Sequence, residues 1–247
     1  MIKGPIALRE EMKASNLLKI KDYLTWNIFR PLQELKNKSW IYELFKGAYR
    51  VNVLTKTNLS DLDDLQAYFR NGDIEKKFSP PMEYNLSLTR RFGATISEEA
   101  TKTDVVLEST EKLILIETVL DSDIAFATLQ DPTRDRLSRI LDVGSAYAKT
   151  NNQEFFFIFL TPDLPYGTRL YHYRMHEFYH HPLGIKEKLP HRKDLSWHDL
   201  SDHIGWMTWE QVMKIWEKYV PTEEIIGTVE FREIKKLMEE AVLRVQM

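Results

Sequence analysis

The sequence predicts an α/β or α+β domain, in which a central mixed β-sheet is flanked by helices and follows an N-terminal helical region. Residues 101–108 and 113–119 are rich in β-forming side chains, and the short polar stretch 109–112 between them predicts an antiparallel hairpin. A helical segment at 135–144 comes next, followed by the apolar segment 154–162. A helix between strands indicates a crossover, so we expect parallel as well as antiparallel pairs in one sheet.

Composition limits the classes of protein that fit this chain. Its 247 residues can bury a full core, and 34 Lys and Arg against 37 Asp and Glu give a formal charge of −3. That charge excludes an overall basic coat for nucleic acid, although a local basic face stays compatible with it. Cysteine is absent, which excludes disulfides, thiolate zinc sites and a cysteine nucleophile.

The hydropathy pattern argues against a membrane protein. The longest apolar runs, such as residues 155–160, are far shorter than the roughly 20 residues that a membrane-spanning helix needs. The first residues lack the apolar core of a signal peptide. We therefore expect a cytoplasmic protein that has no membrane partner.

Helical patterns dominate the first part of the chain. Residues 5–24 space their apolar side chains compatibly with a helix, and Pro31 is expected to interrupt its continuation. Residues 60–64 offer a helix cap and an acidic first turn, and Asn71-Gly72 provides a stop signal. The apolar residues between them share one helical face, namely Leu62, Leu65 and Phe69. These signals predict a helix over 60–71.

The pair Pro80-Pro81 marks a boundary, after which residues 82–92 form a predicted helix closed by Gly93. We therefore divide the chain into an N-terminal helical region (1–79), an α/β core (80–220) and a C-terminal helix that packs on the core (221–247). Residues 209–219 and 230–245 each carry an apolar stripe at helical spacing. We assign these stripes to the core.

The predicted hairpin brings two carboxylates together. With a loop of four residues, the numbers of paired residues sum to 221, so Asp104 lies across from Glu117 with Cβ atoms roughly 5 Å apart. Two opposed carboxylates repel each other unless solvent surrounds them or a cation bridges them. Either a solvated strand face or a site for a hard cation such as Mg²⁺ satisfies this condition.

In this context the chain resembles the PD-(D/E)XK, or restriction-endonuclease-like, nuclease superfamily. In that family a helix with a Glu precedes a strand with an Asp, a second strand carries Glu-x-Lys, and a helix with polar residues follows before another apolar strand. Glu83 resembles the helix Glu, Asp104 the Asp and Glu117 the acidic member of Glu-x-Lys. Arg136 and Arg139 lie where the polar residues of the later helix are expected, and the Trp-containing segment 207–213 is similar to the helix start that often closes such folds.

The resemblance implies a function as well as a fold. It implies a nuclease that hydrolyses phosphodiester bonds with Mg²⁺ or Mn²⁺, and a nucleic-acid partner, with DNA expected before RNA. Glu83, Asp104 and Glu117 would hold the metal ion. The residues expected to bind substrate phosphates are Arg90, Arg91, Arg136 and Arg139. A homodimer is compatible with this assignment.

The chain departs from the family at one catalytic position. Val119 occupies the place of the lysine that positions water and offsets charge on the reacting phosphate. The register places Lys102 across from Val119, so Lys102 is either a relocated catalytic lysine or an ordinary edge-strand lysine. The replacement of this lysine is therefore also compatible with an alternative function, in which a catalytically degenerate nuclease fold serves in nucleic-acid binding or protein assembly.

A rival motif predicts a third function. His176, Glu177 and His180 match H-E-x-x-H, the zinc-binding helix of metallopeptidases. All seven histidines lie between residues 172 and 203, and His172 would share the same helical face. Pro182 ends this helix at once and no third ligand is evident, so the cluster at 172–181 also matches an amphipathic surface that faces a partner.

Overall fold

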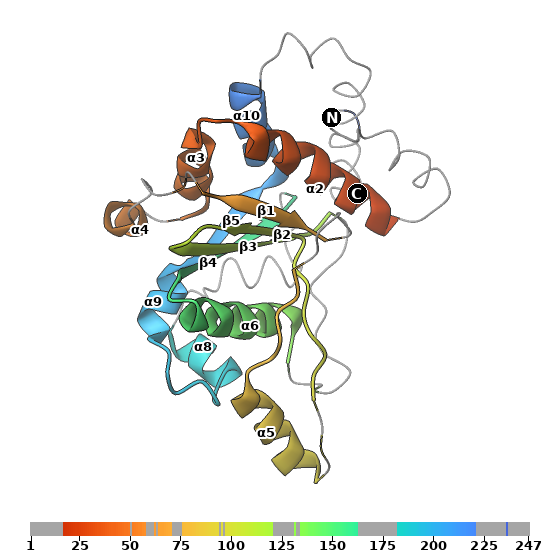
Figure 1. The fold of residues 1–247 in the computed structure, drawn as a ribbon, viewed down its shortest axis with the longest axis vertical. Helices are drawn as coiled ribbons and strands as arrows, with labels where there is room; N and C mark the ends of the chain where they lie inside the picture. The colour runs from red at the N-terminus through yellow and green to blue at the C-terminus, as the bar shows by residue number, and fades with distance from the viewer. Residues whose placement is uncertain are drawn as a thin grey trace.

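The computed structural model describes residues 17–49, 51–57, 62, 64–70, 76–93, 95, 97–120, 131, 134–162, 182–220 and 236. These residues form a sheet with helices on both faces (Figure 1). The strands are β1 (Gln66–Phe69), β2 (Val105–Glu108), β3 (Lys112–Thr118), β4 (Glu154–Thr161) and β5 (Ile204–Thr208). The helices are α2 (Leu17–Glu34), α3 (Ser39–Ala48), α4 (Val51–Lys56), α5 (Met82–Phe92), α6 (Arg136–Thr150), α8 (Pro182–Lys188), α9 (Trp197–Asp202) and α10 (Trp209–Tyr219).

The sheet is mixed, as predicted, with its strands in the order β1-β2-β3-β4-β5. Strand β2 is antiparallel to both β1 and β3, whereas β4 is parallel to both β3 and β5. Val105 pairs with Ile116 and Glu108 with Leu113, so the predicted register of the β2–β3 hairpin is confirmed. The ladder begins only at Val105, because the chain bends at Asp104 and Thr101 forms an isolated bridge with Phe78.

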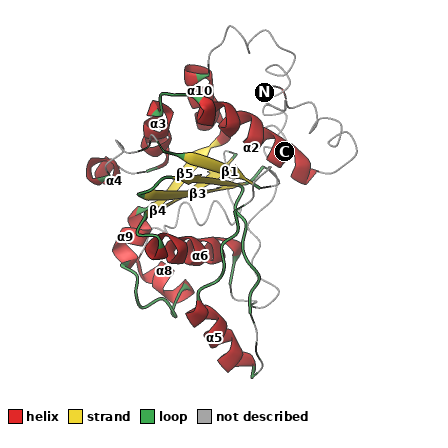
Figure 2. Ribbon diagram, viewed as in Figure 1, coloured by secondary structure: helices red, strands yellow, loops and turns green. Residues whose placement is uncertain are grey.

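Side chains of alternate strand positions build two hydrophobic layers. Figures 1 and 2 show α2, α3 and α10 on one side of the sheet and α6, α8 and α9 on the other. The core below α2, α3 and α10 contains the strand residues Val105, Leu107, Ile114 and Ile116. The core around α6 contains Val106, Leu113, Leu115 and Phe157. Both faces of β3 and β4 are covered, which explains why their sequences are almost continuously apolar.

Local capping signals define the helices that flank the sheet. The Asp135 side chain accepts a hydrogen bond from the Ser138 backbone at 2.7 Å and starts α6. Thr208 and Gln211 form a capping box at the start of α10. Gly93 ends α5 in the left-handed conformation, with φ of 68°. The sequence predicted all three helices, although α6 extends beyond the predicted end at residue 144.

The predicted helix over 60–71 is wrong. Within that range, Gln66–Phe69 forms the edge strand β1, which pairs with β2 from Gln66↔Glu108 to Phe69↔Val105. The three residues of the supposed helical face, Leu62, Leu65 and Phe69, are indeed buried. Buried apolar side chains are compatible with a strand as well as with a helix. In the strand, the ring of Phe69 packs edge-on against Trp26 of α2, with 4.8 Å between the ring centroids. Pairing with the otherwise unpaired edge of β2 therefore determines that residues 66–69 are extended rather than helical. Part of the predicted N-terminal helical region 1–79 thus belongs to the sheet.

Other N- and C-terminal predictions have mixed outcomes. Helix α2 continues through Pro31 to Glu34, so the expected interruption at Pro31 is wrong. Residues 1–16, most of the predicted helix 230–245 and the H-E-x-x-H segment lie outside the described residues. None of the described helices is both long and apolar enough to cross a membrane.

The close approach of α6 to the sheet gives a stability test. A Cβ atom on Gly144 would lie 2.5 Å from Phe155 Cε2 and 2.6 Å from Leu115 Cδ1, both within a packed core. We expect Gly144→Ala to lower the free energy of unfolding by about 1–3 kcal/mol through overpacking, although alanine favours helices. Urea denaturation measures this change.

Gly47→Ala is the matched control for that substitution. Its Cβ atom would lie 2.7 Å from the terminal methyl of Met207, a flexible side chain that can move aside. We expect this variant in α3 to be as stable as the wild type or more stable by up to about 1 kcal/mol. Equal stabilities of the two alanine variants would contradict the packing described for α6.

Candidate functional site at the end of the hairpin

Asp104 is a buried carboxylate at the point where the chain enters β2. It accepts hydrogen bonds from the backbone N–H and hydroxyl of Thr118, both at 2.8 Å. Lys21 Nζ of α2 lies 2.9 and 2.8 Å from its two oxygens. Arg70 Nη1, just after β1, lies 3.4 Å from Oδ1. Each oxygen of this carboxylate therefore has donors, and together the donors come from three separate parts of the chain.

Glu117 lies on β3 and faces α6. Arg136, the first residue of α6, holds it with Nε at 2.5 Å from Oε1 and Nη2 at 3.2 Å from Oε2. The same Nη2 donates to the carbonyl of Lys102 at 2.9 Å. This two-pronged contact suits a planar guanidinium and fixes the start of α6 against the sheet.

The two carboxylates influence each other, although their pKa values shift in opposite directions. Burial raises the pKa of Glu117, the negative charge of Asp104 raises it further, and Arg136 offsets only part of the effect. Burial also acts to raise the pKa of Asp104, but the charge and hydrogen bonds of Lys21, helped by Thr118, bring it below its ordinary value. Asp104 is thus the firmly ionised member of the pair.

Protein cations, rather than solvent alone, resolve the predicted repulsion. Lys21, Arg70 and Arg136 face the two carboxylates, which leaves one surplus positive charge in this cluster. Every oxygen of Asp104 and Glu117 already accepts from a protein donor. Among the residues that the structure describes, no three His, Asp or Glu side chains are grouped to hold an ion. The described residues therefore do not fit a divalent-metal site.

The structure separates Glu83 from the other two predicted metal ligands. Glu83 lies on α5, which Figure 1 places beyond α6, at the far end of the molecule from the sheet. Its exposed side chain lines a different cavity. The sequence order of helix and strand matched the family, but α5 is an extension between β1 and β2 that leaves the sheet.

The predicted pairing of Lys102 with Val119 is not formed. The β2–β3 ladder starts at Val105, and the Val119 backbone N–H donates instead to Leu160 on β4 at 2.8 Å. A different lysine, Lys21 of α2, contacts Asp104. Its contact with Asp104 joins residues 83 positions apart, so hairpin register contains no signal for it.

The predicted phosphate-binding arginines separate into two groups. Arg136 contacts Glu117, and Arg139 lies nearby on α6 with Nε 3.3 Å from Glu98 and Nη2 donating to the Glu99 carbonyl at 2.6 Å. Arg90 and Arg91 lie in the last turn of α5 and line the cavity that contains Glu83. The sequence therefore identified basic residues of two sites and assigned them to one.

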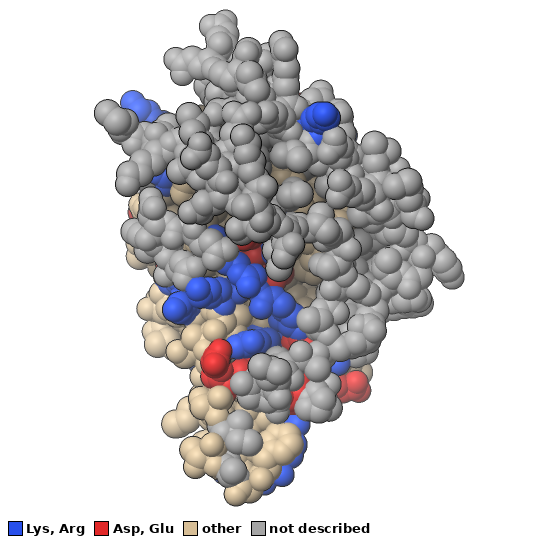
Figure 3. Space-filling view, turned by 90° about the vertical axis from the view of Figure 1, so that its right-hand side faces the viewer, with Lys and Arg blue, Asp and Glu red and all other residues tan. Residues whose placement is uncertain are grey.

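Basic side chains gather on the face of the molecule that includes this end of the sheet. Figure 3 shows lysines and arginines in a band across the middle of that face, with acidic side chains among them. Arg70 and Arg136 keep 34% and 27% of their side-chain surface exposed, so both can meet a ligand while they contact the carboxylates.

Comparisons of the chain with family models, with curated proteins and with solved structures found no match.

The ion pair of Asp104 gives a prediction about pH. The pKa of Asp104 is lowered in the folded state, so its contribution to stability is complete above the unfolded pKa of about 3.9 and is lost as pH falls through the folded pKa. We expect Asp104→Asn to cost about 3 kcal/mol at pH 7, because it leaves Lys21 facing a neutral group in a mostly buried position.

Urea denaturation of wild type and Asp104→Asn at a series of pH values between about 7 and about 2 measures this difference, because the loss is complete only below the folded pKa. The difference should shrink as the pH falls. Glu99→Gln, a change at an exposed carboxylate, is the control and should leave stability within about 0.5 kcal/mol of the wild type at each pH. A cost of Asp104→Asn that stays constant with pH would contradict the ion-pair assignment.

Proposed function

We propose that this chain binds nucleic acid through its phosphates, on a restriction-endonuclease-like core, without metal-dependent cleavage. One observation carries the proposal: at the place where the family resemblance puts the metal ion, Lys21, Arg70 and Arg136 outnumber the carboxylates of Asp104 and Glu117. An excess of positive charge repels a divalent cation and attracts a phosphate.

The energetics of the ion pairs point the same way. A metal ion could bind these carboxylates only after Lys21 and Arg136 release them. Separating a buried carboxylate from its cation costs several kcal/mol, because the partners are left without compensation in a poorly solvated place. Val119 supplies no ammonium group for the chemistry that the family lysine performs.

The cations of the site are suited to phosphates. The guanidinium groups of Arg70 and Arg136 are partly exposed, and their planar donors match phosphate oxygens in pairs. The band of basic side chains around this end of the sheet could follow several successive phosphates (Figure 3). Such an extended contact favours a polymer over a single small anion.

The topology is consistent with this assignment. The β2–β3 hairpin is followed by α6 as the crossover, and β4 joins the sheet parallel to β3. This order of hairpin, helix and strand supports the resemblance, with Asp104 just before β2 and Glu117 on β3.

A Mg²⁺-dependent nuclease is the second candidate function. Lys21 favours it, because its Nζ atom lies 2.8 Å from Asp104 and its charge acts against the rise in the pKa of Glu117, so an ammonium group is present near the two carboxylates despite Val119. In that function Lys21 would take the role of the missing family lysine, which is to orient water and offset charge at the phosphate.

Fluorescence anisotropy with labelled DNA and RNA, together with gel analysis of cleavage, tests both candidates. We expect binding that weakens steeply between about 50 and about 200 mM salt, that persists in EDTA, and that occurs without cleavage in Mg²⁺ or Mn²⁺. Arg70→Ala should weaken binding several-fold and reduce the salt slope by about one. Lys149→Ala, at an exposed site near the opposite end of α6, should not.

Two outcomes would overturn the proposal. Absence of nucleic-acid binding at low salt would remove the function altogether. Mg²⁺-dependent cleavage that disappears in both Glu117→Gln and Lys21→Met would instead establish the nuclease.

A further inference from the structure

A cavity of 840 Å³ lies beside α5, the helix that Figure 1 places beyond α6. Its lining comes from α5 between Glu83 and Arg91, from the segment 187–193, and from Asp131 and Arg134. The lining follows most of α5, a helix of 11 residues and therefore about 16 Å long. A wall of that length can contact several residues of a bound chain. The cavity shares no lining residue with the cluster around Asp104 and Glu117.

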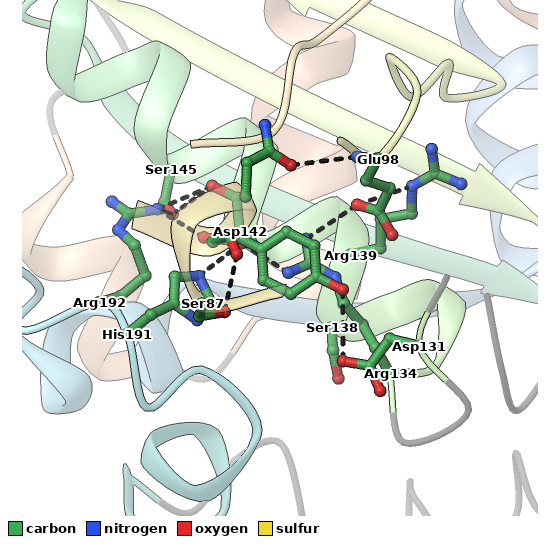
Figure 4. A network of polar contacts seen from close by, with 12 residues as sticks. Ser87, Glu98, Asp131, Arg134, Ser138, Arg139, Asp142, Ser145, His191 and Arg192 are labelled. Atoms are coloured by element: carbon green, nitrogen blue, oxygen red, sulfur yellow. Dashed lines mark hydrogen bonds and ion pairs between the residues drawn. The ribbon is translucent and has the colours of Figure 1, made fainter. Parts of the chain in front are cut away.

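Behind this lining lies an ionic network whose charges face one another (Figure 4). Arg134 is 3% exposed and forms ion pairs with Asp142, at 2.9 Å, and with Glu98, at 3.4 Å. Arg192 Nη1 at 2.9 Å and His191 Nε2 at 2.8 Å also hold Asp142. The network joins α6 to the segment that follows α8, so it fixes two walls of the cavity. Because Arg134 is buried, a bound molecule meets the more exposed residues of the lining instead.

The exposed charges of the cavity are mostly basic. Arg91 keeps 45% of its side-chain surface exposed, whereas its partner Asp131, 3.2 Å away, is buried. Lys188 is 27% exposed and lies 3.6 Å from Asp135, which is also buried. A bound molecule therefore meets the cations of these pairs rather than their carboxylates. The other exposed charged residues of the lining are two basic ones, Arg90 and Lys193, and two acidic ones, Glu83 and Glu187.

Exposed apolar side chains accompany these charges. Of the large apolar side chains that the described residues expose, all but Tyr42 lie on α5 and α8. Met82 and Leu86 are one helical turn apart and share a face of α5, and Leu86 also lines the cavity. Apolar side chains that stay exposed among charged ones are typical of surfaces that bind another protein.

This combination of side chains separates the possible occupants. Nucleic acid suits the cations, but the aliphatic side chains of Met82 and Leu86 offer no ring for a base to stack on, and Glu83 and Glu187 repel phosphates. A second copy of the chain would bring the same patch against itself in a twofold contact, so its basic residues would repel each other. A polypeptide with both acidic and apolar side chains matches the charge and the apolar contacts together.

We infer that the cavity beside α5 docks an acidic segment of a partner protein. Apolar side chains of that segment cover Leu86 and Met82, and its carboxylates meet the basic residues of the lining, above all Arg90, Arg91 and Lys193. The inference is independent of nucleic-acid binding at the hairpin end.

Selection of random peptides displayed on phage, with the full chain as bait, tests this inference. We expect the selected peptides to be enriched in Asp and Glu beside Leu, Phe or Trp. Synthetic copies of these peptides should bind the full chain in fluorescence anisotropy, with an affinity that falls as salt is added.

Variants of α5 locate the binding. Leu86→Ser removes an apolar contact and should weaken peptide binding about tenfold. Arg90→Glu replaces attraction by repulsion and should weaken it by about tenfold or more. Both positions are exposed, so we expect the variants to fold, which circular dichroism checks. Tyr42→Ser and Lys46→Glu are matched changes at exposed positions of α3 and should leave peptide binding unchanged.

Several results would overturn the inference. These are a selection without enrichment of any peptide, selected peptides without acidic residues, and peptide binding that neither α5 variant weakens. Sedimentation of a wild-type dimer that Leu86→Ser makes monomeric would assign the surface to a second copy instead. Displacement of the peptides by DNA, with DNA binding that falls in both α5 variants, would assign it to nucleic acid.

Discussion

Two buried carboxylates at one end of the β2–β3 hairpin must be neutralised if the sheet and its two helical layers are to pack as they do. Asp104 lies just before β2 and Glu117 lies on β3, and neither could stay ionised there without a nearby cation. Lys21 comes from the helical layer on one side of the sheet, and Arg136 comes from α6 on the other. The same ion pairs therefore join both layers to the sheet and give the site its positive charge.

Short-range signals in the sequence predicted much of the fold. The even loop fixed the hairpin register, and caps such as Asp135 fixed the start of α6, because these features involve neighbouring residues. The sequence did not predict strand β1, because residues 60–71 have a helical pattern and only pairing with the edge of β2 makes residues 66–69 extended. Lys21 was missed for the same kind of reason, because only the tertiary fold brings α2 to Asp104.

The candidate sites show a similar division. The predicted hairpin register brings Asp104 and Glu117 to the same end of the hairpin, although the observed ladder starts only at Val105. The position of Glu83 depends on where α5 packs, and no local pattern contains that information. Arg90 belongs to the cavity beyond α6 rather than to the carboxylates. The predicted basic residues are thus divided between the cluster of Asp104 and Glu117 and the cavity lined by α5.

We propose that protein cations, rather than a metal ion, neutralise Asp104 and Glu117. Calorimetric titration of the wild-type protein with Mn²⁺, with Asp104→Asn as the comparison, distinguishes the two. We expect no saturable heat in either protein at millimolar Mn²⁺. Stoichiometric Mn²⁺ binding by the wild type that Asp104→Asn abolishes would contradict it.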